Sequence, residues 1–368
     1  MTELSLHGFH QLLGARFSTV GAAEVVNDYG EAAAEHRALT RTAGVLDLSF
    51  RSRLCLTGAD RARFLHGQVT NQVQELTPGQ GCYAALVTAK GKLVSDLNIF
   101  CLPEELLLDF EPCLSGTVTK RFEQYIIADD VQVVDVSPHY GLLSIQGPLS
   151  AAVLDGLELG APLPRERLHS VAIHHETLGE LHCANQPRGR QAGFDLFVPQ
   201  PALASILDRL VQSARAHDSR PCGWQALEMI RIEAGQPRFG ADMDETHLAP
   251  EAGLADRAIS YSKGCYIGQE VIARIRTYGQ VNKELRGLLL PDDLPELPAR
   301  GAKLRQADRE VGFVTSALAS PAFRRNVALG YVHRSCNEPG TELQLVTAQG
   351  PRKVQVVRLP FDLAVAEP

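Results

Sequence analysis

One cysteine in this sequence lies in a segment whose residue types favour chemistry at sulfur. The segment Lys263–Glu270 reads Lys-Gly-Cys-Tyr-Ile-Gly-Gln-Glu, with Cys265 two residues after Lys263. The residues predict the start of a helix here, and both the Lys263 charge and the free N–H groups of a first helical turn favour a thiolate. A redox, metal-holding or nucleophilic thiol is one interpretation. A small apolar residue packed at a helix start is the other, and both stay open.

A second segment has a carboxylate and an amide two residues apart, a pair that could contact a ligand. Residues Leu93–Leu102 predict a strand, on which Asp96 and Asn98 share one face because strand side chains alternate. Asp96 beside Asn98 can polarise a bound amine. The competing interpretation is a polar strand edge that faces water.

An arginine near the end of a predicted helix, 223–234, is the third candidate. Arg231 precedes a Gly/Pro loop that carries Arg238 and Asp242. A guanidinium in this position can pair bidentately with a carboxylate ligand. A solvated arginine beside an acidic surface loop explains the same residues.

Alternating helices and strands must position these groups. Helix formers and apolar periodicity predict helices at 31–41, 58–67, 114–127, 202–216 and 223–234, with strands between them, such as 81–88, 93–102 and 105–110. Residues 284–368 are short β-like runs broken by Pro and Gly. We therefore predict an α+β region over 1–283 and a small all-β, barrel-like domain over 284–368.

Composition narrows the class of protein. The chain has 368 residues and a net charge of −7, which argues against a broad nucleic-acid surface and makes direct nucleic-acid binding unexpected. No apolar run reaches the roughly 20 residues that span a bilayer, and we see no secretory signal. The eight cysteines form no C-x-x-C pair, so we expect reduced thiols, a cytoplasmic location and no metal site.

Together these segments resemble the folate-binding superfamily of the glycine-cleavage T-protein, an aminomethyltransferase. Within it, Lys263–Glu270 resembles the signature of the YgfZ branch, folate-binding proteins implicated in iron–sulfur cluster assembly or repair. The resemblance covers nearly the whole chain, in the segments Asn27–Glu35, Gly44–Ser49, Phe64–Asn71, Gly91–Asp96, Ile145–Pro148, Arg231–Asp242, Gly312–Ser316 and Gly330–Val332.

The resemblance implies a three-part T-protein-like cloverleaf around a central folate cavity, with the C-terminal β-barrel as one part. It implies that Arg231 binds folate and that Asp96 matches a catalytic aspartate, with Ser95 where the family has a second acid. The family's Gly-Tyr-Thr-Gly-Glu segment aligns near Pro187–Gly193, which has no acid until Asp195. These departures argue against aminomethyl transfer.

The resemblance implies, as a first hypothesis, a tetrahydrofolate-binding accessory protein that supports iron–sulfur assembly machinery and client enzymes, tRNA-modifying ones among them. Cys265 would act on a cluster or partner and Lys263 would keep it ionised. Asp195, Gln269 and Arg231 would contact folate, with Asp96 near the pterin. A second hypothesis is a folate-dependent aminomethyltransferase or demethylase, in which Asp96 orients the amine. A third is a non-catalytic scaffold that senses folate.

Overall fold

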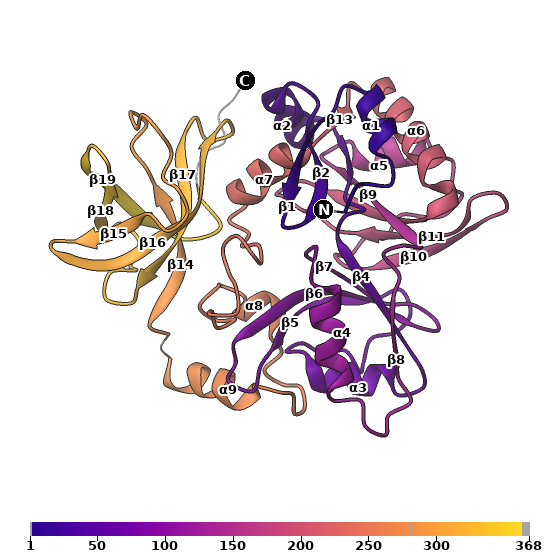
Figure 1. The fold of residues 1–368 in the computed structure, drawn as a ribbon, viewed down its shortest axis with the longest axis horizontal. Helices are drawn as coiled ribbons and strands as arrows, with labels where there is room; N and C mark the ends of the chain where they lie inside the picture. Colours follow the sequence, from indigo (N-terminus) through magenta and orange to yellow (C-terminus); the bar gives the residue numbers. More distant parts are fainter. Residues whose placement is uncertain (1, 280, 363–368) are drawn as a thin grey trace. The chain divides into compact units, whose positions relative to one another are not determined.

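The computed structural model of the chain describes residues 2–279 and 281–362, which fold into two units. Unit 1 contains the described residues of Met1–Leu86, Ser95–Ile230 and Ser262–Tyr266. Unit 2 contains those of Val87–Val94, Arg231–Tyr261 and Ile267–Pro368. Each unit is therefore assembled from segments that lie far apart in the sequence, as the colours of Figure 1 show.

A five-stranded sheet in the order β5-β6-β7-β4-β8 carries the first candidate residues. It belongs to unit 1 except for Val87–Val94, which belongs to unit 2 and contains the last residue of β5, the β5–β6 turn and the first two residues of β6. Strand β6 lies between two neighbours, so both of its edges are paired. The strands are β4 (Ser52–Thr57), β5 (Gly81–Val87), β6 (Leu93–Cys101), β7 (Leu106–Phe110) and β8 (Gln132–Asp135).

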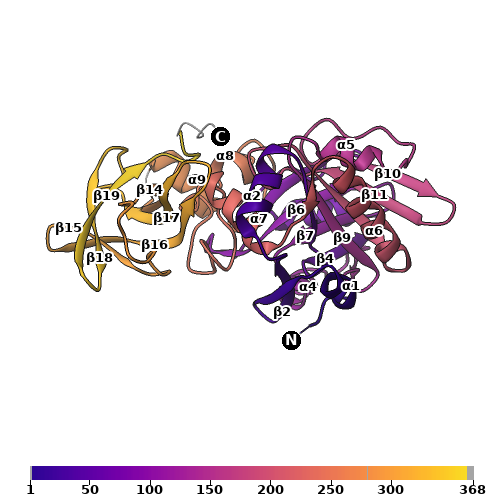
Figure 2. The same ribbon diagram turned by 90° about the horizontal axis from the view of Figure 1, so that it is seen from above.

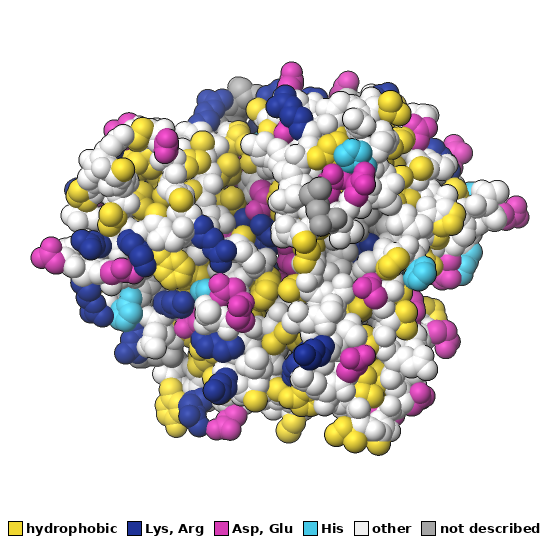
Figure 3. Space-filling view, in the orientation of Figure 1, with side chains coloured by type: hydrophobic (Ala, Val, Ile, Leu, Met, Phe, Trp, Pro, Cys, Tyr) yellow, Lys and Arg dark blue, Asp and Glu magenta, His cyan; other side chains and the backbone are white. Residues whose placement is uncertain are grey.

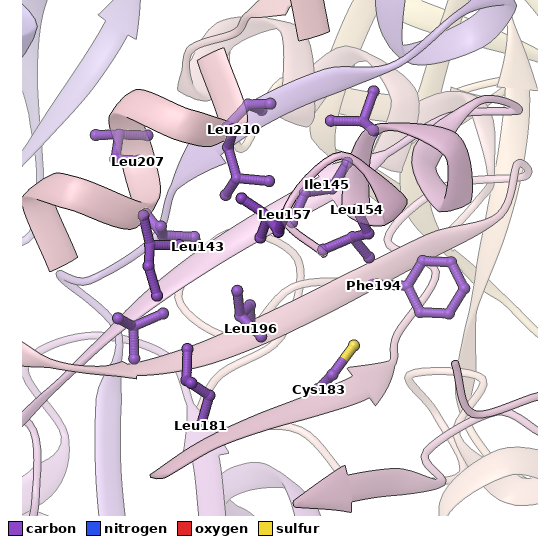
Figure 4. Packing of buried hydrophobic residues seen from close by; sticks show 14 of the residues in the cluster. Leu143, Ile145, Leu154, Leu157, Leu181, Cys183, Phe194, Leu196, Leu207 and Leu210 are labelled. Carbon is purple, nitrogen blue, oxygen red and sulfur yellow. The ribbon is translucent and has the colours of Figure 1, made fainter. Parts of the chain in front are cut away.

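A six-stranded sheet in the order β10-β11-β12-β9-β3-β13 forms the other layer of unit 1. Helix α6 (Gln200–Ala216) buries Leu203, Ile206, Leu207 and Leu210 against it, because this spacing puts them on one helical face. Figure 4 shows Leu207 and Leu210 above the sheet residues of this core. The strands are β3 (Gly44–Asp47), β9 (Tyr140–Gln146), β10 (Ser170–His175), β11 (Gly179–Asn185), β12 (Gly193–Pro199) and β13 (Arg220–Pro221).

A two-stranded hairpin, β1 (Arg16–Val20) and β2 (Ala23–Asp28), lies near the N-terminus and is indigo in Figure 1. No helix in the described residues is long and apolar enough to cross a membrane. The remaining helices are α1 (His7–Leu12), α2 (Ala32–Arg41), α3 (Arg61–Gln68), α4 (Ser115–Glu123), α5 (Ser150–Asp155), α7 (Trp224–Glu233), α8 (Ala255–Ala258) and α9 (Gln269–Tyr278).

The C-terminal strands close an antiparallel barrel in the order β14-β17-β16-β15-β18-β19, drawn in orange to yellow in Figures 1 and 2. Its interior is filled by alternating residues such as Leu288, Val314 and Val356. The strands are β14 (Lys283–Leu289), β15 (Lys303–Gln306), β16 (Arg309–Ser320), β17 (Arg325–His333), β18 (Glu342–Thr347) and β19 (Gly350–Val357).

The predicted fold class, α+β followed by a C-terminal β-barrel, is confirmed. The predicted helix 114–127 is shorter, since α4 ends at Glu123. The short elements that were not predicted are α1, β1, β2, β3, α5, β13, α8 and β15. The division at 283/284 stays a prediction, and residues 363–368 of the predicted second domain lie outside the described residues.

On the face drawn in Figure 3, basic and acidic side chains are interspersed.

Candidate functional site

Asp96 lies beside a polar cluster in unit 1. It lies on β6, and the Tyr83 hydroxyl from β5 donates to its Oδ2 at 2.8 Å. Its Oδ1 is buried and has no hydrogen-bond partner among the described residues. A buried carboxylate oxygen without a donor costs free energy, and such groups are characteristic of functional sites.

A buried ion-pair network lies on β7 and at the ends of β4 and β7, in the same sheet as Asp96. Arg51 donates from Nε to Asp109 Oδ1 at 2.7 Å and from Nη1 to Glu111 Oε1 at 2.6 Å. Asn98, directly opposite Asp109 in the β6–β7 register, donates to Asp109 Oδ2 at 3.0 Å. The face that the sequence predicted for Asp96 and Asn98 is therefore turned to a buried polar cluster and not to water.

The network continues to Asp195 through one arginine. Arg188 forms an ion pair with Asp195 and lies 3.5 Å from Asp109 Oδ2. Ser144, opposite Asp195 in the β9–β12 register, donates to it at 2.7 Å. Asp195 is thus engaged by two donors inside unit 1, and its predicted contact with folate stays a prediction.

The electrostatics of this cluster distinguish its three aspartates. Burial, then the Glu111 charge, raises the pKa of Asp96 to about 6, against the opposing Tyr83 hydrogen bond. Burial also acts to raise the pKa of Asp109, but Arg51 and Arg188 outweigh it and hold that pKa below its usual value. Burial raises the pKa of Asp195, partly offset by Arg188. Asp96 is therefore suited to exchange protons near neutral pH.

The Lys263 ammonium is hydrogen-bonded to backbone carbonyls. Lys263 is buried, and its Nζ donates to the carbonyls of His66, Val69 and Asn71 at 2.5, 2.7 and 2.9 Å. Burial lowers the pKa of Lys263 to about 8. Lys263 therefore fastens its segment to the end of α3 and the loop that follows, and its predicted role beside the sulfur of Cys265 stays a prediction.

Cys265 does not begin a helix, so this part of the prediction is wrong. Helix α9 starts at Gln269, in unit 2, while Cys265 belongs to unit 1 and is exposed. Gly268 caps the helix with φ of 86°, and a Cβ there would approach the Thr88 carbonyl to 2.5 Å. A left-handed conformation in close contact with backbone requires glycine. Helix α9 therefore begins only after Gly268.

Arg231 belongs to unit 2, where its guanidinium already has a carboxylate partner. Arg231 is buried, and its Nη1 donates to Asp242 Oδ2 at 2.5 Å. Asp242 also accepts from Thr315 at 2.6 Å and Ser316 at 2.7 Å, both on β16. The arrangement ties the helix end to the barrel. Folate binding by Arg231, like that by Gln269 on α9, stays a prediction.

Sequence reasoning missed Tyr83, Arg51, Asp109 and Glu111. One signal was present, because Asp109 follows three leucines in a strand that reads as fully buried. A lone carboxylate in such a strand needs a buried cationic partner. The sequence does not say which arginine supplies it.

Comparisons with known proteins agree with this fold and extend over the whole chain. A family model described as GCVT N-terminal domain matches residues 6–263, and one described as Glycine cleavage T-protein C-terminal barrel domain matches residues 283–362. The crystal structure of glycine cleavage system aminomethyltransferase T from Bartonella henselae is 21% identical and superposes with a TM-score of 0.89. That match covers 100% of this chain and 99% of the other, and it confirms the T-protein fold.

Two curated relatives of similar length are named aminomethyltransferase. An aminomethyltransferase from Symbiobacterium thermophilum is 28% identical, covering 97% of this chain and 96% of the relative. One from Ralstonia pickettii is 29% identical with the same coverage. These names overturn the first hypothesis, an accessory protein for iron–sulfur enzymes, and do not support iron–sulfur or tRNA-modifying partners.

The same findings favour the second hypothesis, against the expectation that the chain departs from aminomethyl transfer. Tetrahydrofolate, the cofactor predicted from the sequence, agrees with this family, whose aminomethyltransferases use it as the one-carbon acceptor. The chain belongs to the GCVT family, with its N-terminal domain and its C-terminal barrel domain both present.

Proposed function

We propose that this chain is a tetrahydrofolate-dependent aminomethyltransferase in which Asp96 handles the amine. The observation that carries the proposal is the Asp96 carboxylate, with Oδ2 bonded to Tyr83 and Oδ1 buried without a partner. Family membership and the names of the full-length relatives support the reaction class. Tetrahydrofolate is the acceptor in this proposal.

The reaction needs proton transfer but no oxidant. A donor X–CH₂–NH₂ and tetrahydrofolate give methylene-tetrahydrofolate, ammonia and X–H, so the carbon keeps its oxidation level. The ammonium form of the donor carries positive charge, which the ionised Asp96 attracts and orients. A carboxylate with a pKa of about 6 is ionised at neutral pH and still basic enough to take a proton from the amine.

The charge balance of the cluster favours a cationic substrate group. Two arginines, Arg51 and Arg188, face the carboxylates of Asp109, Glu111 and Asp195, and Asp96 adds a further negative charge. The arginines form their ion pairs with those three carboxylates, and Arg51 acts on Asp96 only through its charge, which lowers the pKa of Asp96. Asp96 therefore has no ion-pair partner among the described residues, and its carboxylate is available to a ligand. An amine is the group that this charge selects.

The proposal is tested by turnover of a matched pair of variants. We expect Asp96→Asn to lower the formation of methylene-tetrahydrofolate from an S-aminomethyl thioether by about 10²–10⁴-fold, the range for loss of general acid–base catalysis. Asp135→Asn, an exposed carboxylate on β8 of the same sheet, should keep wild-type turnover. Equal turnover of Asp96→Asn and wild type would sink the proposal.

We further propose that Lys263–Glu270 places this chain in the YgfZ-type branch of the superfamily and that Cys265 is a reactive thiol. What supports this is the anchored backbone: Lys263 has three carbonyl partners, while Cys265 is exposed. Packing therefore explains the lysine and leaves the cysteine without a structural reason for its type.

Alkylation followed by mass spectrometry tests the thiol. Among the described cysteines Cys113 and Cys265 are exposed, so a Cys113→Ser background isolates the reaction of Cys265. We expect Cys265 to react faster than Cys113 does in a Cys265→Ser background, with a rate that tetrahydrofolate changes. Equal rates that are indifferent to tetrahydrofolate would make Cys265 an ordinary surface thiol.

A further inference from the structure

Three side chains near the N-terminus bring metal-binding atoms together. Glu3, His7 and Glu24 each offer one ligand atom, and these atoms all lie within 4.8 Å of one another. They come from two pieces of backbone: Glu3 and His7 lie four residues apart at the start of α1, and Glu24 lies on strand β2. All three belong to unit 1. An imidazole with two carboxylates is a donor set that divalent transition metals accept.

The imidazole is the point on which the two carboxylates converge. His7 Nδ1 lies 2.9 Å from Glu24 Oε2 and 3.7 Å from Glu3 Oε1. The ring stacks on Phe17 with centroids 4.2 Å apart and an interplanar angle of 16°. Stacking fixes the ring plane, and a fixed ring orientation is what preorganises a histidine ligand.

Backbone contacts hold the Glu24 carboxylate and the chain segment that carries Glu3. Glu24 is buried, and its Oε2 accepts the Leu4 amide N–H at 3.2 Å. The Glu24 amide donates to the Thr2 carbonyl at 2.9 Å, so the chain that carries Glu3 runs beside β2. Exposure rises in order from Glu24 to His7 to Glu3, which leaves one side of the cluster open to water.

We propose that Glu3, His7 and Glu24 form a binding site for a divalent transition-metal ion of the Mn²⁺, Fe²⁺ or Zn²⁺ class. The ion takes the position between His7 Nδ1 and the carboxylate oxygens, and water completes its coordination. Binding replaces the His7 Nδ1–Glu24 Oε2 hydrogen bond, since a metal needs the nitrogen lone pair. The cysteine spacing, from which no metal site was expected, does not bear on a site made of histidine and glutamate.

Mn²⁺ binding to the full-length protein, followed by electron paramagnetic resonance of the free ion, tests the site. Mn²⁺ prefers oxygen and nitrogen ligands, so the exposed thiols Cys113 and Cys265 compete little. We expect one Mn²⁺ per chain in the wild type. Glu3→Gln, a change at an exposed side chain that leaves the fold intact, should weaken binding at least tenfold, as should His7→Gln.

Glu166→Gln is the matched control. Glu166 pairs with His169 at 3.4 Å, also in unit 1, but forms no three-ligand group among the described residues. We expect this variant to bind Mn²⁺ as the wild type does. Absence of Mn²⁺ binding below millimolar concentration would overturn the proposal. So would binding that Glu3→Gln leaves unchanged, or that Glu166→Gln weakens to the same extent.

Discussion

Asp96 combines partial burial, one hydrogen bond from Tyr83 and one oxygen without a donor. At neutral pH its charge is poorly solvated, and the nearby Glu111 charge adds repulsion. The carboxylate is therefore a source of instability in the native state. Functional groups are commonly kept in such environments because the same features that lower stability give them their reactivity.

Asp96→Asn should therefore stabilise the protein while it removes activity. The pKa of Asp96 is raised to about 6 in the native state from an ordinary 3.8. At low pH the carboxyl is protonated in both the native and the unfolded state and does not destabilise the protein. As pH rises towards about 6 the unfolded chain ionises more readily than the native state, so the native state loses stability. The gain in stability of Asp96→Asn over wild type is therefore largest above pH 6. At about 1.4 kcal/mol per pKa unit, the gain is at most about 3 kcal/mol. Thermal midpoints at pH 4 and pH 7.5 measure it, and a variant less stable than wild type at pH 7.5 would contradict this account.

Two neighbours of Asp96 should move the pH profile of turnover in opposite directions. The Tyr83 hydrogen bond lowers the pKa of Asp96 and the Glu111 charge raises it. Activity requires ionised Asp96, so it should fall as pH drops through about 6. Tyr83→Phe should shift this limb to higher pH, and Glu111→Gln should shift it to lower pH. A shift of both variants in the same direction would mean that another group titrates.

Strand alternation was enough to predict that Asp96 and Asn98 share a face. It could not predict Tyr83 or Arg51, because those contacts depend on which strands pair and in which register. The helix predicted at Cys265 failed for a local reason, since Gly268 adopts a left-handed conformation against the Thr88 carbonyl. No residue type in the segment reveals that contact.

At the scale of elements, Lys263–Glu270 is divided between the two units. Lys263 fastens the first part to carbonyls around the end of α3 in unit 1. Gly268 places the start of α9 against the β5–β6 turn in unit 2. The lysine and this glycine thus have structural reasons for their types. The element predicted as a single helix start is a linker that is anchored at both ends.

Lys263→Met should destabilise the protein, and Cys265→Ser should not. Methionine matches the length of the lysine stem but leaves the carbonyls of His66, Val69 and Asn71 without their donor, and each buried unsatisfied group costs about 1–3 kcal/mol. We expect a loss of about 2–4 kcal/mol in urea unfolding. Cys265 is exposed, so its change should stay within about 0.5 kcal/mol. Equal effects of the two variants would remove the anchoring role.

Asp242 is the corresponding element-scale contact in unit 2. It accepts from Arg231, Thr315 and Ser316, and so joins the end of α7 to β16 of the barrel. Asp242→Ala leaves Arg231 buried without this carboxylate and should cost about 3–5 kcal/mol. Hydrogen exchange at the barrel amides, followed through thermal unfolding of unit 2, measures this loss of stability. Unchanged barrel protection would show that the pair is dispensable.

On the scale of the whole molecule, the C-terminal barrel could be predicted but the composition of its unit could not. Short runs broken by Pro and Gly are typical of small barrels, and they identified β14 and β16–β19. Unit 2 also contains Val87–Val94 and Arg231–Tyr261, two segments that are distant from the barrel strands in the sequence. A tertiary contact joins these two segments, because the Lys92 ammonium donates to the Thr246 carbonyl at 2.6 Å. Such contacts between distant segments leave no local pattern.

Transfer of a labelled carbon tests the proposed function of the whole molecule most directly. The wild-type protein would be mixed with tetrahydrofolate and an S-[¹³C]aminomethyl thioether, and the ¹³C spectrum followed over time. We expect growth of the methylene-tetrahydrofolate resonance with release of ammonia, and a rate that falls as pH drops through about 6, where Asp96 takes up a proton. A protein that binds tetrahydrofolate but leaves the label on its donor at every pH would contradict the proposed function.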